Sequence, residues 1–80
     1  MSRQHPQPYK RPEQEGGEEI SKDEPVEVHI RANFWAVGFV IGGLQFFRML
    51  AGWGYEVEFT SPSGQRKRDI FRPKDVRRVA

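Results

Sequence analysis

Residues 55–79 read YEVEFTSPSGQRKRDIFRPKDVRRV and decide the fold. In their first part the apolar Tyr55, Val57 and Phe59 alternate with polar residues. This period of two predicts a strand with one buried and one wet face. The next four residues, Ser61-Pro62-Ser63-Gly64, predict a turn, because Pro fixes one φ and Gly tolerates a positive one.

Three further strands follow from the same pattern on either side of this unit. The basic run after the turn leads to a strand that ends at Ile70-Phe71, and Pro73-Lys74-Asp75 separates it from a last short strand at 76–79. Upstream, Pro25–Arg31 alternates apolar and polar residues and predicts the first strand, with His29 on its outward face.

The segment 34–53, FWAVGFVIGGLQFFRMLAGW, allows three interpretations. We prefer a second strand from Phe34 to about Ile41, ended by glycines and followed by an apolar connection from Leu44 to Gly54. The run is also long enough to cross a membrane. A soluble βαβ unit with a helix from Asn33 to about Ala51 is the third interpretation.

The apolar connection carries large side chains that cannot all face water without cost. They fold over the barrel, form a short helix or bury in another subunit. The last option predicts a homo-oligomer that associates through these residues: Leu44, Phe46, Phe47, Leu50 and Trp53.

Composition excludes several classes of site and places a tail at the N-terminus. The chain has no Cys, and His5 and His29 lie far apart, so we expect no metal site. Residues 1–24 hold few large apolar side chains, which predicts a disordered tail. No apolar segment of a signal peptide follows its basic residues, and we expect a soluble intracellular protein whose compartment the sequence does not name.

The pattern as a whole predicts an all-β fold, a small five-stranded SH3-like barrel over residues 25–80. Closing a small sheet on itself removes exposed edges. Positive charge gathers at its end, because residues 66–78 hold seven basic residues against two acids. This basic face suits phosphate contacts.

The strands resemble Tudor and Agenet domains, in particular the Tudor repeats of histone demethylases. The matching features are Phe34-Trp35, Tyr55-x-Val57-x-Phe59, Gly64, Asp69, Pro73 and Asp75-Val76. In that family an aromatic cage holds methylated Lys or Arg. The resemblance assigns Trp35 (or Phe34) and Phe59 to the cage, with Trp53 or Tyr55 completing it, since Ser61 or Pro62 occupies the position of the next aromatic.

The chain also resembles the small plasmid-borne type II dihydrofolate reductases, which confer trimethoprim resistance. The similarities are its length, the tail, Trp35, the stretch from Gly54 to Glu58 and the C-terminal Arg78-Val79-Ala80. That family is a homotetramer whose central pore binds folate and NADPH. Its signature Val-Gln-Ile-Tyr corresponds to Arg68-Asp69-Ile70-Phe71, so the resemblance makes Asp69, Ile70 and Phe71 the pore residues, with Asp69 in place of Gln.

We therefore expect a non-enzymatic binding module that needs no cofactor. Its partner is a peptide, methylated or not, or a nucleic acid, met by the basic strand face and exposed aromatics. The residues expected to contact the ligand are Trp35, Tyr55, Phe59, Arg66, Lys67, Arg68 and Arg72. The alternatives are an NADPH-dependent enzyme of the type II reductase kind and a small membrane-anchored protein, although a membrane partner is not our expectation.

Overall fold

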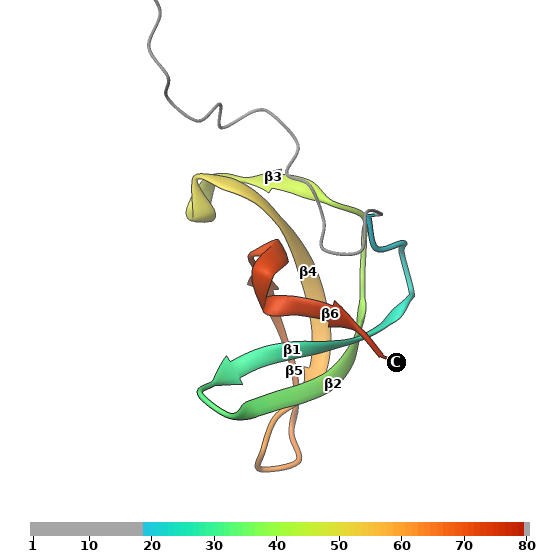
Figure 1. Cartoon of the computed structure of the whole chain (residues 1–80), viewed down its shortest axis with the longest axis vertical. Helices are drawn as coiled ribbons and strands as arrows, with labels where there is room; N and C mark the ends of the chain where they lie inside the picture. Colours follow the sequence, from blue (N-terminus) through green and yellow to red (C-terminus); the bar gives the residue numbers. More distant parts are fainter. Residues whose placement is uncertain (1–18, 80) are drawn as a thin grey trace, which may run out of the picture.

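The structure, a computed structural model, describes residues 19–79, which form six strands and two 3-10 turns (Figure 1). In chain order the elements are β1 Pro25–Arg31, β2 Phe34–Val40, β3 Gln45–Phe47, η1 Arg48–Leu50, β4 Gly52–Thr60, β5 Arg66–Phe71, η2 Pro73–Asp75 and β6 Val76–Arg78. Every strand pair is antiparallel. The sheet runs β3-β4-β2-β1-β6, and β5 pairs with β4.

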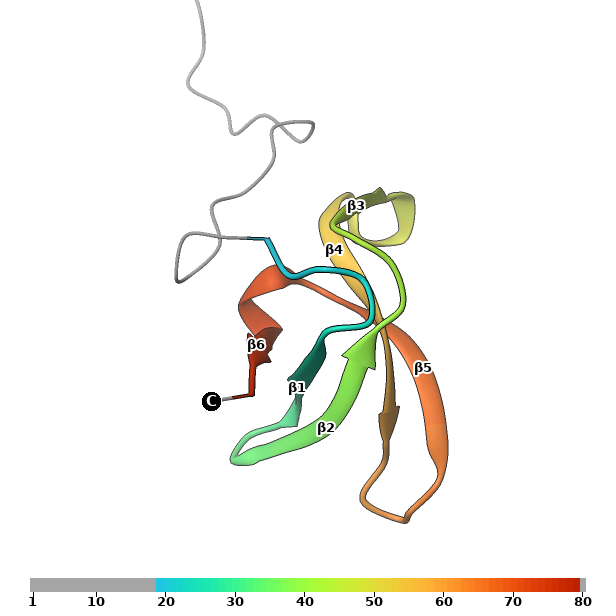
Figure 2. The ribbon, with the colours of Figure 1, turned by 90° about the vertical axis from the view of Figure 1, so that its right-hand side faces the viewer.

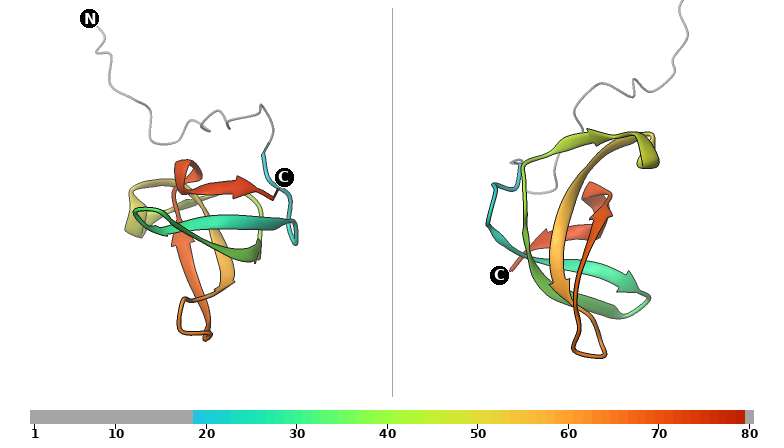
Figure 3. Two further views of the ribbon diagram at one scale, coloured as in Figure 1. Left: turned by 60° about the horizontal axis from the view of Figure 1, so that its bottom comes forward. Right: turned by 180° about the vertical axis from the view of Figure 1, so that it is seen from behind.

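The sheet curls into a half-barrel with β6 near one edge and β5 at the other (Figure 2). Seen along another direction, β1 and β2 cross the direction of β4 and β5 (Figure 3). Gly38 lets β2 and β4 approach closely, because a Cβ there would overlap the Glu58 carbonyl oxygen and lie 2.8 Å from Phe59 Cα. The predicted all-β fold with a barrel-like curled sheet is confirmed, and the half-barrel is compatible with an SH3-like architecture.

The inner face of the curl carries the core, as the period-two alternation requires. Tyr55, Val57 and Phe59 of β4 are buried, with Val26 and Val28 of β1 on the facing strand. The remaining buried apolar residues are Ile20, Ala36, Val40, Leu44 and Val76, and the half-buried Ile30, Trp53 and Phe71 pack against them.

The two hairpin turns have backbone conformations that their residues favour. Gly64 has a φ of 89° at the β4–β5 turn, and the Ser61 N–H donates to the Gln65 carbonyl across it at 2.7 Å. Asn33 has a φ of 68° at the β1–β2 turn, a conformation that Asn tolerates better than most residues.

The segment 34–53 is extended, so neither of its helical interpretations is correct. It forms β2, the short β3, η1 and the first residues of β4. Within the described part of the chain no helix has the length and apolarity needed to cross a bilayer. The prediction of five strands missed β3, and β4 begins at Gly52 rather than at Tyr55. Both differences arise because the apolar connection forms a hairpin, in which β3 pairs with the start of β4. The Phe46 and Trp53 rings meet edge to face there, with their centres 6.0 Å apart.

The side chains proposed for self-association are distributed over this hairpin. Leu44 is buried in the core of the same chain, and Trp53 packs against that core. Phe46 is exposed, whereas Phe47 and Leu50 are half-buried. The side chain of Met49 is the most exposed large apolar group of the region, at 73%. Association through this hairpin remains a prediction.

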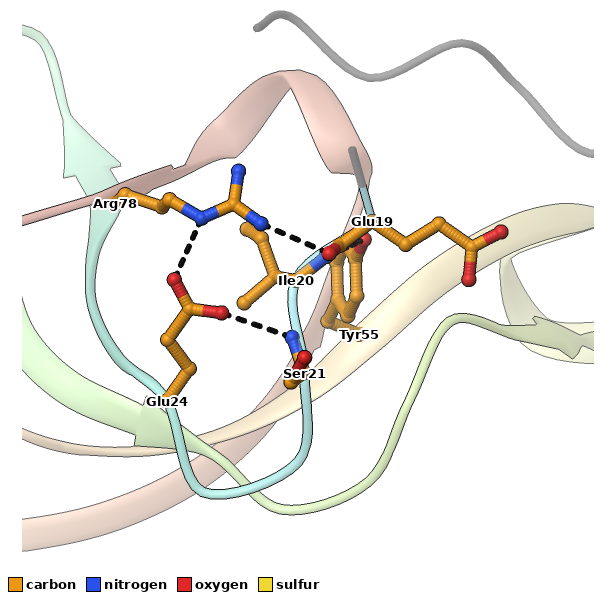
Figure 4. A network of polar contacts seen from close by, with 6 residues as sticks. All are labelled: Glu19, Ile20, Ser21, Glu24, Tyr55 and Arg78. Atoms are coloured by element: carbon orange, nitrogen blue, oxygen red, sulfur yellow. Dashed lines mark hydrogen bonds and ion pairs between the residues drawn. The ribbon is translucent and has the colours of Figure 1, made fainter. Parts of the chain in front are cut away.

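Residues 19–24 form a strap over the end of β6, although the expected tail included them. The Ile20 side chain is buried in the core, and its N–H donates to the Tyr55 hydroxyl oxygen at 3.0 Å (Figure 4). Arg78 donates to the Glu24 carboxylate at 2.6 Å and to the Glu19 carbonyl at 2.8 Å. The expected barrel boundary at 25 therefore falls inside packed structure, while residues 1–18 of the predicted tail lie outside the described residues.

Two pKa values shift where the strap packs on the sheet. The hydrogen bond from the Ser21 N–H, together with the Arg78 guanidinium, lowers the pKa of the Glu24 carboxyl below its usual value. Burial raises the pKa of the Tyr55 hydroxyl, an effect that the Ile20 N–H only partly offsets.

Candidate functional site

The basic strand β5 presents its cations on both faces of the sheet. Arg68 lies opposite Glu58 in the register, and Arg66 follows two residues earlier on the same outer face. Both donate to the Glu58 carboxylate, at 3.0 Å from Arg66 and 3.5 Å from Arg68, and their side chains are 72% and 60% exposed. Lys67 lies opposite the buried Phe59, so its side chain emerges on the inner face.

A cavity of about 330 Å³ opens on this inner face, between the end of β1 and the β4–β5 turn. The β1–β2 turn and the β4–β5 turn lie at the same end of the half-barrel (Figures 1 and 2). We call this site the end cavity. It is lined by four apolar and four polar residues: Ile30, Phe59, Pro62 and Phe71, and Arg31, Ser61, Lys67 and Asp69.

A register shift in β1 brings Arg31 to the end cavity. His29 pairs with Trp35, but Arg31 pairs with Phe34, so Ile30 and Arg31 together oppose one residue of β2. Strict alternation would turn Arg31 away from the face that carries Ile30. The bulge instead places both neighbours in the cavity lining, as bulges do where a side chain is re-aimed.

The charged groups of the end cavity do not neutralise one another. Neither Arg31 nor Lys67 makes an ion pair or a side-chain hydrogen bond with any residue in the range 19–79. Asp69 Oδ1 accepts the N–H of Ile70 at 2.8 Å. Ser61 Oγ is used within the turn, where it accepts the Gln65 N–H at 3.2 Å. The lining thus offers two unpaired cations and one carboxylate beside apolar walls.

The aromatic walls of the cavity come from the core. Phe59 and Phe71 meet edge to face with their ring centres 5.5 Å apart. Phe59 itself is 7% exposed, and Tyr55, further along the inner face of β4, is fully buried with its hydroxyl hydrogen-bonded to residue Ile20 of the strap. Of the aromatic residues expected to contact ligand, Phe59 therefore reaches the cavity only as part of its wall.

Trp35 lies on the outer face, away from the end cavity. Its ring stacks on His29 at 4.8 Å between centres, and the Arg77 guanidinium lies 3.8 Å from its centre. Arg77 also donates to Glu27 at 2.8 Å. Since Trp35 and Phe59 project from opposite faces of the sheet, these two residues do not share one cage, and a cage built with Phe34 in place of Trp35 stays a prediction.

The remaining predicted residues divide between the cavity and other surfaces. Asp69 and Phe71 line the end cavity, whereas Ile70 lies opposite Glu56 on the outer face. Arg72 donates to the Leu50 carbonyl at 3.0 Å, next to η1 and away from the cavity lining.

Sequence reasoning did not name Arg31, Ile30, Ser61 or Pro62 as ligand-contact residues. Ser61 and Pro62 were interpreted as a turn at the position where the Tudor family has an aromatic residue, and Arg31 as the last residue of the first strand. The unpaired condition of Arg31 depends on the bulge, which the alternation in Pro25–Arg31 does not reveal. Among residues 19–79 no three His, Cys, Asp or Glu side chains are grouped to hold a metal ion, and His5 lies outside that range.

No protein-family model, no curated protein and no solved structure matches this chain.

Proposed function

We propose that the chain is a non-enzymatic binding module for single-stranded nucleic acid, held along β5 and in the end cavity. One observation carries the proposal. Two cations from distant strands, Arg31 and Lys67, converge on a concave site with aromatic walls and find no counter-ion among the described residues. A site that keeps cations unpaired beside apolar surface suits an anion that also carries a flat ring.

The charge of the end cavity argues against a methylated Lys or Arg as ligand. A methyl-ammonium cage needs ring faces and negative potential. Here Arg31 and Lys67 outnumber the single carboxylate of Asp69, so a cationic ligand meets net repulsion. The partner expected from this balance is an anion.

Among anionic partners, nucleic acid matches more of the surface than an acidic peptide does. Each nucleotide brings a phosphate together with a ring that stacks on apolar or aromatic surface. An acidic peptide would use the cations but leave Phe59 and Phe71 without a partner. Outside the cavity Arg66 and Arg68 share one carboxylate and stay largely exposed, so they extend the positive strip to neighbouring phosphates. A single strand is required, because a stacked and paired base cannot enter a cavity.

The test is fluorescence anisotropy of the full chain with a labelled oligo(dT) of about twelve nucleotides, a length within the range of site sizes of small β-barrels. Four contacting cations predict that log K falls with log salt concentration with a slope of roughly −3. Lys67→Glu is expected to weaken binding at least about tenfold. Arg48→Glu, the same charge change at η1 beyond the cavity lining, is the matched control and should weaken binding only about twofold.

Two results would overturn the proposal. One is the absence of oligonucleotide binding at low salt. The other is an equal loss of affinity in the Lys67 and Arg48 variants, which would show attraction by net charge alone. Acidic and trimethyl-lysine peptides tested in parallel assign the site to another polymer if either binds more tightly than the oligonucleotide.

A second candidate, the type II reductase kind of enzyme, is favoured by one feature of the end cavity. Asp69 and Phe71, which correspond to residues of the family signature, line the same cavity as Lys67. That function requires a tetramer with a shared pore. Light scattering combined with an NADPH titration tests it, and a monomer that leaves NADPH fluorescence unchanged excludes it.

A further inference from the structure

The end cavity contains a hydrogen-bond acceptor that phosphate binding does not use. Asp69 lies on the inner face opposite Val57, two residues beyond Lys67 along β5, and its carboxylate lines the cavity. Residues two apart on a strand are about 7 Å apart. Lys67 and Asp69 form no ion pair, so they mark two separate positions, an anion position near the turn and an acceptor position further along the strand.

The backbone orients the Asp69 carboxylate. Oδ1 accepts the Ile70 N–H at 2.8 Å, which holds the group against its own strand. Oδ2 has no hydrogen-bond partner among residues 19–79. An ionised carboxylate has lone pairs but no proton to donate, so any ligand group that meets it must offer N–H or O–H.

We infer that the end cavity takes one unstacked base of the bound strand and prefers guanine, whose N–H groups donate to Asp69. The inference rests on the proposed function. Guanine carries two neighbouring donors on its Watson–Crick edge, N1–H and the N2 amino group, which match the two oxygens of a carboxylate. Adenine and cytosine place an acceptor beside their single amino group, and thymine flanks one N–H with two carbonyls, so each of these turns a lone pair toward the carboxylate.

The apolar walls and the cations complete this arrangement. Phe59, Phe71 and Ile30 offer the surface against which the ring packs, and Arg31 and Lys67 hold the phosphate at the mouth. A volume of about 330 Å³ lies within the range of sites that accept small organic ligands. Recognition of a splayed base on its Watson–Crick edge is the usual way that single strands are read.

The experiment places one central dG, dA or dC in the labelled oligo(dT) and measures anisotropy with the full chain. A single guanine forms no quadruplex, and the strands differ only at the central base, so the ratio of their affinities reports how that base is recognised. The dG strand is expected to bind at least roughly fivefold more tightly than oligo(dT), the lower end of the discrimination that a good paired contact gives. Asp69→Asn is expected to abolish this ratio, whereas Asp75→Asn, which lies outside the cavity lining, should preserve it.

A second measurement does not depend on a variant. The Ile70 amide hydrogen-bonds to Asp69, so its NMR resonance reports directly on that carboxylate. Guanosine monophosphate should shift it more than thymidine monophosphate does. Salt-dependent binding of oligo(dT) without a guanine preference, or with a preference that Asp69→Asn retains, overturns the inference and leaves the proposed function intact. Failure of every oligonucleotide to bind overturns the proposed function itself.

Discussion

The cations of β6 and the cations of the end cavity carry the same charge, but only those of β6 form ion pairs within the described chain. Arg77 and Arg78 of β6 lie 2.8 Å and 2.6 Å from carboxylate oxygens of Glu27 and Glu24. Arg31 and Lys67 have no such partner among the described residues. Of the seven cations in residues 66–78, Lys67 is the one that makes no polar contact within the range 19–79.

This difference separates stability from binding. A cation that tethers two segments of the chain stabilises the fold, and its removal leaves a partner without its charge. A cation without a partner contributes little to stability, but it attracts an anion without first breaking an internal contact. Substitutions in the β6 region should therefore change the free energy of unfolding, and substitutions in the cavity should change affinity.

Arg78→Glu should produce the largest change in stability. The substitution places a second carboxylate next to the carboxylate of Glu24, and it removes the side chain that donates to the Glu19 carbonyl. Hydrogen bonds to charged groups contribute about 1.5 to 3 kcal/mol, so we expect a loss of about 2 kcal/mol in urea unfolding followed by tryptophan fluorescence. In a domain this small such a loss is a large part of the total.

Arg68→Glu is the matched control for this prediction. It makes the same charge change beside a carboxylate, but Arg68 is 60% exposed and its contact with Glu58 is longer, at 3.5 Å. Exposed pairs contribute little, so a loss of about 0.5 kcal/mol is expected. Equal losses in the two variants would contradict the distinction between tethering and exposed cations.

Tyr55→Phe should cost about 1 to 2 kcal/mol at neutral pH, because it removes the oxygen that accepts the buried Ile20 N–H. The effect depends on pH with a definite sign. The pKa of the Tyr55 hydroxyl is raised above 10.0 in the folded chain, so the hydroxyl ionises first in the unfolded chain. The wild-type protein therefore loses stability as pH rises above 10.0, and its advantage over Tyr55→Phe should shrink there. A constant difference between pH 7 and pH 11 in urea titrations would refute this account of the strap.

Arg77→Lys is expected to cost about 0.5 to 1 kcal/mol. Lysine keeps the charge but loses the planar guanidinium that lies over Trp35 while donating to Glu27. Urea unfolding measures the loss, and Trp35→Leu, which removes the aromatic ring, supplies the double-mutant cycle that isolates the ring contact. Additive losses in the cycle would show that the cation and the ring do not interact.

β1 and β4 could be predicted from the sequence because their alternation is regular. β2, β5 and β6 were predicted from the glycine and proline residues that bound them, although the segment of β2 also allowed two helical interpretations. Alternation records which side chains are buried, and burial dominates the energy of a small sheet. The same signal fails for β3, where Gln45-Phe46-Phe47 is too short and too apolar to show a period. It also fails for the strap, because Ile20 is an isolated apolar residue in a polar stretch.

The candidate site was predicted only in part, because pairing across the sheet decides which cations are free. The sequence shows Arg66, Lys67 and Arg68 as one basic run, but it does not show that Arg66 and Arg68 form ion pairs with Glu58. Arg78 meets Glu24 across 54 residues of chain, a contact that no local pattern encodes. The bulge that turns Arg31 into the cavity depends on the register with Phe34, which forms only when the hairpin closes.

Lys67→Ala should have the smallest effect on stability, within about 0.5 kcal/mol of the wild-type protein, because the side chain is exposed and makes no polar contact in the described chain. The same variant should reduce the salt slope of oligonucleotide binding by about 0.7, the contribution of one phosphate contact to a single strand. Anisotropy over a series of salt concentrations measures the slope, with Arg48→Ala as the control for net charge. An unchanged slope would show that Lys67 does not contact phosphate. Self-association of Lys67→Ala in light scattering would then indicate that Lys67 protects the edge of β5 from pairing with other strands.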